Sequence, residues 1–268
     1  ELEWYRGYEV KRGEKMTRII MHGCNGAMGR VISELLAGNT DTKIVAGVDL
    51  QGEKLFDYPV FTSLESIDVE ADAIIDFASA KAIDGLLDYV EAKKIPVVLC
   101  TTGLSNEQLE RVEKVSQSVA VLRSANMSLG INLLLKLVKE AAEVLTKAGF
   151  DMEIVEKHHR RKLDAPSGTA LALADAINEQ MNGEYEYTFD RSQRHEPRRE
   201  KEIGISAVRA GSIVGDHDVI YAGEDEVVTI SHIAYSRKIF AKGAIAAAEY
   251  LSGKKAGMYS MADVIDKK

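Results

Sequence analysis

The stretch TRIIMHGCNGAMGRVISELL, residues 17–36, decides the fold, because it joins an apolar strand pattern to a helical pattern through three closely spaced glycines. Residues 18–21 form the apolar run before the glycines. Residues 28–36 place four apolar side chains at helical spacing, namely Val31, Ile32, Leu35 and Leu36. The stretch therefore predicts one strand-turn-helix step.

The same rhythm continues through the first half of the chain. Short apolar runs separated by helix-length segments are typical of a parallel sheet that is covered on both faces. The predicted class is α/β, with a Rossmann-like doubly wound parallel sheet. Further strands are predicted at residues 43–48, 73–77, 96–99 and 119–122, and helices at 80–92 and 105–116.

The rhythm changes after residue 122, which indicates a second domain of α+β type. Strand patterns at 203–209, 217–222 and 227–233 follow one another without helices between them, so an antiparallel or mixed sheet is predicted. Residues 182–201 are polar with little periodicity and predict a loop. A strand is also predicted at 151–157, and helices at 128–147, 167–181 and 236–251.

Composition excludes several classes of protein. The 268 residues have a net charge of −8 and a mean hydropathy of −0.14. No apolar run reaches the roughly 18 residues of a membrane span, and nucleic-acid binders are more often basic. Two cysteines and no secretory signal predict a cytoplasmic protein. Residues 1–15 are expected to be a cloning remnant or a short native extension.

The glycine turn has the context of a dinucleotide site. Its residues are Gly23, Cys24, Asn25, Gly26, Ala27 and Met28, followed by Gly29. Glycines let the backbone approach a pyrophosphate, and the next helix offers free N–H groups. Asp49 ends the second strand about 20 residues later, where a carboxylate binds the ribose hydroxyls. The alternative is a tight turn that binds no dinucleotide.

The residues beside Asp49 favour NADH, with NADPH accepted. Leu50 and Gln51 follow Asp49, and the nearest cation in the sequence is Lys54, whereas a 2′-phosphate is usually met by an arginine. Two further turns follow the fourth and fifth strands, where a cofactor would continue. They consist of Cys100, Thr101 and Thr102, and of Ser124, Ala125, Asn126 and Met127. Each turn is otherwise an ordinary strand-to-helix loop.

Charged, histidine and hydroxyl side chains are most concentrated in residues 156–170, EKHHRRKLDAPSGTA. Two histidines, two arginines and two lysines within six residues predict a local anion site in an acidic protein. Ser167, Gly168 and Thr169 precede a helical pattern, so they predict a second anion site at a helix start. Two converging sites suit a dicarboxylate. The alternatives are a solvated basic face, a nucleic-acid patch, and a plain N-cap at Ser167.

Residues 158–170, HHRRKLDAPSGTA, resemble the signature H-H-x-x-K-x-D-A-P-S-G-T-A of the dihydrodipicolinate reductase family, also called 4-hydroxy-tetrahydrodipicolinate reductases. The resemblance extends from residue 16 to the C-terminal helix. It implies a homotetrameric enzyme that reduces its substrate to tetrahydrodipicolinate in diaminopimelate and lysine biosynthesis, with NADH or NADPH. It also implies a cofactor domain over residues 16–126, completed by 236–268, and a substrate and tetramerisation domain over 127–235.

The resemblance also implies roles for single residues. His158 is expected to exchange the proton, and Lys162 to be a second general acid. The substrate carboxylates are expected to bind His159, Ser167, Gly168 and Thr169. The glycine turn, Asp49 and the two later turns are expected to line the cofactor, and no metal is expected. Leu50 and Cys100 depart from the arginine and glycine that the family often has there.

Two rival functions fit parts of the sequence. A non-catalytic NAD(H) sensor on the same scaffold would have no need of His158 and Lys162 beside an anion site. A different nicotinamide-dependent dehydrogenase, for example one acting on an amino acid, is the second rival. A further hypothesis is that oxidation of Cys24 or Cys100, in the cofactor turns, blocks cofactor binding. The alternative is that both are small buried side chains without a redox role.

Overall fold

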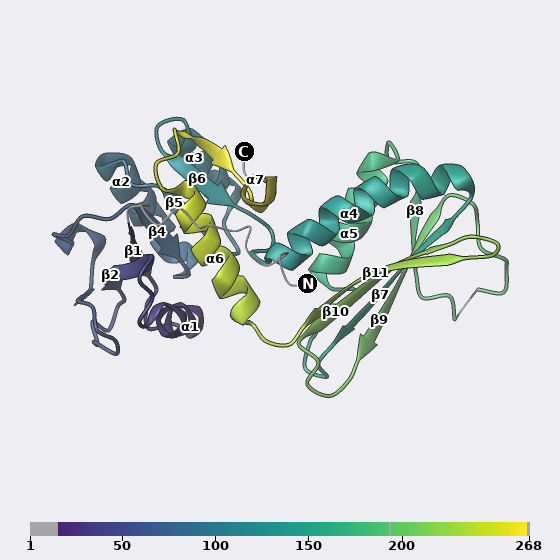
Figure 1. Cartoon of the computed structure of the whole chain (residues 1–268), viewed down its shortest axis with the longest axis horizontal. Coiled ribbons are helices and arrows are strands. Elements are labelled where there is room, and N and C mark those ends of the chain that lie inside the picture. The colour runs from purple at the N-terminus through teal and green to yellow at the C-terminus, as the bar shows by residue number, and fades with distance from the viewer. Residues whose placement is uncertain (1–15, 193, 267–268) are drawn as a thin grey trace, which may run out of the picture. The chain divides into compact units, whose positions relative to one another are not determined.

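The computed structural model describes residues 16–192 and 194–266, in two compact units (Figure 1). The first unit ends at Ser124 and resumes over Ala244–Ser260. The second unit comprises Ala125–Gly243 and the segment that begins at Met261. The cloning remnant or extension expected at residues 1–15 lies outside the described residues.

The first unit contains a seven-stranded parallel sheet in the order β12-β6-β5-β4-β1-β2-β3. After β1 the chain adds β2 and β3 on one side of β1. It then crosses to the other side, where it adds β4, β5 and β6. The strand order therefore reverses between β1 and β4, and their carboxyl ends flank this topological switch point. Ligands of open α/β sheets bind at such points. The strands are β1 (Thr17–His22), β2 (Thr42–Val48), β3 (Val60–Phe61), β4 (Ala73–Asp76), β5 (Val97–Leu99), β6 (Ala120–Arg123) and β12 (Gly257–Tyr259).

Helices complete the predicted Rossmann-like arrangement of this unit, and the α/β prediction is confirmed. Burial of both sheet faces explains why its strands read as continuous apolar runs; all four residues of β4 are buried. Ser105 and Gln108 form a capping box that fixes the start of α3. The helices are α1 (Ala27–Leu36), α2 (Ile83–Lys93), α3 (Asn106–Ser116) and α6 (Lys238–Leu251), whose first residues belong to the second unit.

The second unit is α+β, as predicted, and its sheet is mixed. The strand order is β11-β10-β7-β9-β8, in which β10 runs antiparallel to β7 and β11 while β9 runs parallel to β7 and β8. The prediction of a continuous loop over 182–201 is wrong, because the edge strand β8 lies within it. The strands are β7 (Asp151–His158), β8 (Glu186–Phe189), β9 (Glu202–Arg209), β10 (Gly215–Ala222) and β11 (Val227–Ala234).

Two helices, α4 (Leu129–Leu145) and α5 (Gly168–Gln180), lie side by side and pack on this sheet (Figure 1). Their apolar residues, such as Val138 and Ile177, share one core with Ile154 of β7 and Val219 of β10. Ser128 caps α4 by accepting a hydrogen bond from the Ile131 N–H. This packing holds the ends of β7 and α5 in fixed positions.

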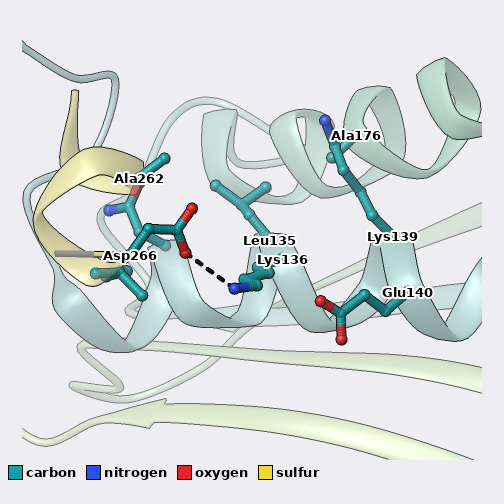
Figure 2. A pocket seen from close by; sticks show the side chains of 9 residues that line it. Leu135, Lys136, Lys139, Glu140, Ala176, Ala262 and Asp266 are labelled. Atoms are coloured by element: carbon teal, nitrogen blue, oxygen red, sulfur yellow. Dashed lines mark hydrogen bonds and ion pairs between the residues drawn. The ribbon is translucent and has the colours of Figure 1, made fainter. Parts of the chain in front are cut away.

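A short C-terminal helix, α7 (Met261–Asp266), packs against α4, where Lys136 donates to Asp266 over 2.9 Å (Figure 2). Ala262 and Asp266 of α7, Leu135 and Lys139 of α4 and Ala176 of α5 line a cavity of about 460 Å³. None of the predicted site residues lines it. No helix of the described chain is long and apolar enough to cross a membrane.

Candidate active site

A cavity lies in the first unit at the carboxyl ends of β1, β2 and β4. Its volume of about 540 Å³ falls in the range of small-molecule sites, roughly 300–1,000 Å³. Its walls include the predicted residues Gly23, Gly26 and Asp49, together with Leu50 and the turn after β4. The structure thus brings the first part of the predicted cofactor site to the switch point of the sheet.

Two glycines of this loop, Gly23 and Gly29, leave no room for a side chain. A Cβ at Gly23, whose φ is +81°, would lie 2.7 Å from the Phe77 carbonyl oxygen. A Cβ at Gly29 would lie 2.3 Å from the Gly23 carbonyl oxygen, so only glycine lets α1 pack this closely on its own loop. The Gly26 N-cap has no side-chain hydrogen bond, and the first turn of α1 carries no acidic residue. This cradle suits the pyrophosphate of a dinucleotide.

Asp49 is held at the cavity by backbone hydrogen bonds. Its carboxylate accepts from the N–H of Asn25 over 3.1 Å and from that of Gln51 over 3.4 Å. Lys54, the nearest cation in the sequence, lies 3.9 Å from Asp57 and does not line the cavity. Lys81 lines it instead. Lys81 is far from Asp49 in the sequence, so the sequence alone did not place it at this site. The pairing of β1 with β4 brings the segment that carries Lys81 to the cavity.

A buried pair joins the ends of β1 and β4 at the same cavity. His22 Nδ1 lies 2.8 Å from Asp76 Oδ1, and the same oxygen accepts from the Ala78 N–H over 3.2 Å. Asp76 is fully buried. The pair orders the turn over residues 77–79, which forms one wall. Sequence reasoning missed it, although both residues are polar and end neighbouring apolar strands.

The remaining cofactor candidates are spread over both units. Ser124 is the last residue of the first unit before the chain crosses, and Ala125, Asn126 and Met127 open the second. Thr101 is buried, Thr102 is exposed, and Ala27 and Met28 begin α1.

Both thiols lie in environments that suppress ionisation. Burial raises the pKa of Cys24 to about 11, and its Sγ would lie 2.7 Å from a Cβ at Gly47. Burial also raises the pKa of Cys100 well above its ordinary value. Because the thiolate is the form that oxidants attack, these directions weigh against an oxidation switch at the cofactor turns.

A second cavity, in the second unit, gathers several histidines. His158 ends β7, while His217 and His232 lie opposite each other on β10 and β11. The rings of His158 and His217 meet edge to face at 5.2 Å. Thr169 and Asn126 complete the polar wall, and Asn126 Nδ2 donates to Thr169 Oγ1 over 3.3 Å. No group of three or more described His, Cys, Asp or Glu residues has the geometry of a metal site.

His158 is oriented by the fully buried Glu156. The His158 Nδ1 lies 2.6 Å from Glu156 Oε2, which leaves Nε2 on the side of Gly215, where a Cβ would lie 3.0 Å from it. Arg209 donates to both carboxylate oxygens of Glu156, over 2.7 and 2.8 Å. Burial opposes ionisation of Glu156, but the hydrogen bonds from Arg209 and His158 outweigh it and lower its pKa.

The start of α5 forms the predicted helix-start site. Ser167 is the N-cap, and its Oγ accepts from the Ala170 N–H over 3.1 Å and lies 3.0 Å from His217 Nε2. A Cβ at Gly168 would meet nothing within 4 Å, so the backbone there is open to a ligand. The first turn of α5 has no acidic residue. Free N–H groups and the helix dipole favour an anion here.

Lys162 and His159 lie apart from the histidine cavity. The Lys162 Nζ pairs with Asp164, 2.8 Å from Oδ1 and 2.7 Å from Oδ2, and Lys162 does not line the cavity with His158. His159 is half-buried, and its Nδ1 has no hydrogen-bond partner within the part of the chain described. The structure therefore brings His158 and Thr169 together but holds Lys162 in a loop ion pair.

Sequence reasoning did not assign His217 and His232 to the site. Burial is the main cause that lowers the pKa of His217 to about 4, with His158 as the second cause. Burial likewise lowers the pKa of His232. Both rings are neutral near pH 7. The sequence shows that both histidines lie within predicted strands. It does not show where these strands lie relative to the strand of His158, and that strand order is what brings the three rings together.

Two family profiles match almost the whole chain: "Dihydrodipicolinate reductase, N-terminus" over residues 17–127 and "Dihydrodipicolinate reductase, C-terminus" over residues 130–265. The 4-hydroxy-tetrahydrodipicolinate reductase of Caldanaerobacter subterraneus subsp. tengcongensis is 53% identical, covering 94% of this chain and 99% of that protein. The reductase of Clostridium tetani is 48% identical, covering 92% of this chain and 96% of that protein.

A solved structure has the same fold. The dipicolinate-bound dihydrodipicolinate reductase from Paenisporosarcina sp. TG-14 superposes with a TM-score of 0.77 at 23% identity, covering 92% of this chain and 98% of that chain. An amine dehydrogenase from Mycobacterium smegmatis has a TM-score of 0.59 at 10% identity, covering 93% of this chain and 96% of that chain. The chain therefore belongs to the dihydrodipicolinate reductase family, the NAD(P)H-dependent oxidoreductases of diaminopimelate and lysine biosynthesis.

Proposed function

We propose that His158 supplies the proton when this chain reduces 4-hydroxy-tetrahydrodipicolinate to tetrahydrodipicolinate. The observation that carries the proposal is that the buried Glu156 carboxylate holds both the His158 ring and the Ser167 N–H at the start of α5. When bound, the reduced nicotinamide supplies the hydride. A proton donor beside an anion site is what a dicarboxylate ring requires after it has accepted a hydride.

The geometry of His158 suits proton transfer. Glu156 occupies Nδ1, so Nε2 is the nitrogen that can face a substrate at Gly215. Imidazole exchanges protons readily near neutral pH, and an electron-rich enamine carbon produced by hydride addition must gain a proton. The 4-hydroxyl of the substrate first leaves with a ring proton as water, which gives the conjugated ring that accepts the hydride. The Nε2 proton of His158 then moves to the enamine carbon, and the His158 ring takes up a proton from water before the next turnover.

Gly168 and Thr169 bind one carboxylate through the free N–H groups of α5, with the Ser167 N-cap and His159 beside them. Lys162 binds a substrate carboxylate after giving up its partner Asp164, and as the second general acid it protonates the 4-hydroxyl that leaves as water. The dipicolinate-bound relative from Paenisporosarcina supports a ligand with two carboxylates.

The cofactor site consists of the loop from Gly23 to Met28, Asp49, the turn from Cys100 to Thr102 and the turn from Ser124 to Met127. NADH is preferred because Asp49 faces the cavity beside the uncharged Leu50. NADPH is also accepted, because Lys81 supplies one cation to the same cavity. Most of the proposed cofactor residues thus belong to the first unit, and the proposed substrate residues belong to the second.

The second unit also assembles a cytoplasmic homotetramer in this proposal. Support comes from the apolar side chains that β11 and the residue after it expose: Val227 is 61% exposed, Ile233 51% and Tyr235 86%. Such side chains on a sheet surface favour burial against another copy. Light scattering on the purified protein is expected to give four times the chain mass, and a monomer would contradict this assembly.

The substrate assignment is tested by comparing substrates under one set of conditions. We expect rapid oxidation of NADH, and slower oxidation of NADPH, when the substrate is generated from pyruvate and aspartate semialdehyde by the preceding synthase. Omitting the synthase is the control. Oxidation that instead requires an amino or 2-keto acid would indicate another dehydrogenase, and NADH binding without oxidation would indicate a sensor.

A further inference from the structure

Glu156 contacts three parts of the site described above. Its Oε2 contacts His158 Nδ1 at 2.6 Å, and its Oε1 accepts from the Ser167 N–H over 3.0 Å. The Arg209 guanidinium spans both oxygens. The side chain is completely buried, so each of these contacts lies away from water.

Arg209 extends the same network to the loop that carries Lys162. Its Nη2 donates to the Asp164 carbonyl oxygen over 2.6 Å, and the Asp164 side chain is the partner of Lys162. Arg209 lies directly opposite His158 in the pairing of β9 with β7. A buried carboxylate that is paired bidentately with arginine remains charged and rigid.

We infer that Glu156 is the positioning residue of the reaction: it keeps His158 oriented for proton transfer and at the same time fixes the distance between His158 and the anion-binding start of α5. Arg209 supports it by neutralising the buried charge and tying down the 160–166 loop. The inference rests on the proposed role of His158. Neither Glu156 nor Arg209 lines the cavity, so both act through their neighbours.

The charge of Glu156 explains why glutamine would not substitute for it. The protonated His158 ring carries N–H groups on both nitrogens, and a carboxylate accepts the one on Nδ1. A glutamine can turn its NH₂ toward that nitrogen, which favours the neutral ring and removes the acid. Related carboxylate-to-amide changes in other enzymes disable a histidine by fixing the wrong tautomer.

Several other charged or titratable groups face His158 and its partners. Arg209 lies on β9, His217 on β10 and His232 on β11, and Asp164 and Lys162 lie on the loop before α5. His217 and His232 are neutral near pH 7, because burial lowers the pKa of each. Glu156, which contacts His158 directly, and its partner Arg209 therefore supply the fixed charges of this network.

The test compares Glu156→Gln with Glu153→Gln. Glu153 lies on the same strand and pairs with its own arginines, Arg191 and Arg198, but it does not contact His158. We expect Glu156→Gln to lower kcat by about tenfold to a hundredfold with a smaller change in KM. We also expect the pH profile of kcat to change, with its alkaline limb moved to lower pH. Glu153→Gln should change neither.

A double-mutant cycle with His158→Gln separates this inference from the proposed function. If Glu156 acts through His158, Glu156→Gln should lower kcat in the wild-type background but have little further effect in the His158→Gln background. Additive losses, or an unshifted pH profile for Glu156→Gln, would overturn the inference. If His158→Gln itself left kcat unchanged, the proposed role of His158 would fail first.

A second variant keeps the test decisive if Glu156→Gln does not fold. Arg209→Lys retains the positive charge but cannot contact both oxygens of Glu156 and the Asp164 carbonyl together. We expect a thermal midpoint and NADH affinity close to the wild-type values, a fall in kcat of about tenfold, and a shifted pH profile. Wild-type kcat and pH dependence in this variant would overturn the inference.

Discussion

The pH dependence of stability tests whether His217 is buried as a neutral ring beside His158. The pKa of His217 is lowered to about 4, chiefly by burial and secondly by the neighbouring His158 ring. In the unfolded chain the same group has an ordinary pKa near 6.5. As the pH falls from 6.5 to 4, the unfolded chain takes up a proton that the folded protein does not, so stability is lost across this window.

The magnitude follows from the two pKa values. At pH 7.5 both states carry a neutral ring, and the contribution is close to zero. At pH 5 the unfolded ring is almost fully protonated while the folded ring is not, which destabilises the folded protein by about 2 kcal/mol. His217→Gln removes this titration while keeping a polar group near the Ser167 hydroxyl, which lies 3.0 Å from His217 Nε2.

Urea unfolding followed by circular dichroism at pH 7.5 and pH 5 measures the effect. Both proteins are studied at one concentration, because assembly shifts apparent stability. The carboxylates titrate in both proteins, so their contribution cancels in the comparison. We expect the wild type to lose about 2 kcal/mol more than His217→Gln between these pH values. Equal losses would refute the argument that burial keeps His217 neutral.

Three further substitutions address the cofactor and substrate sites. Lys81→Ala should raise the KM for NADPH by about tenfold and change the KM for NADH little, because the lysine can pair with the charged 2′-phosphate of NADPH but meets only a hydroxyl in NADH. Initial-rate assays with both cofactors measure the two KM values. Gly29→Ala should weaken NADH binding at least about tenfold in fluorescence titrations, because its Cβ would lie 2.3 Å from the Gly23 carbonyl oxygen and the loop must move; unchanged affinity would contradict the steric argument. Lys162→Ala should lower kcat more than about a hundredfold with NADH affinity nearly intact, and a matching loss of cofactor affinity would refute its role at the substrate.

Much of the architecture was predictable because it depends on local patterns. The strands of the parallel sheet are apolar runs buried on both faces, and the predicted strand at 43–48 is observed as Thr42–Val48. The strand β8 was missed because it is a four-residue edge strand with one buried side chain, Thr188. The two-residue β3 and three-residue β12 are too short to show a period.

The candidate site was predictable only where its residues are close in the sequence. The cluster from His158 to Thr169 carries its own chemical signature, whereas Arg209 lies 53 positions after Glu156 and joins it through the pairing of β7 with β9. His22 and Asp76 are 54 positions apart and meet through the pairing of β1 with β4. Such contacts depend on strand order and register, which composition and periodicity do not reveal.

The most direct test of the proposed function measures NADH oxidation and NADH binding together, for the full chain and for His158→Gln. We predict substrate-dependent oxidation by the wild type, and a large fall in kcat for His158→Gln with an unchanged dissociation constant for NADH. The fall should be at least about tenfold, because water replaces part of the lost acid. Wild-type turnover by His158→Gln, or NADH binding by the wild type without any oxidation of NADH in the presence of substrate, would contradict it.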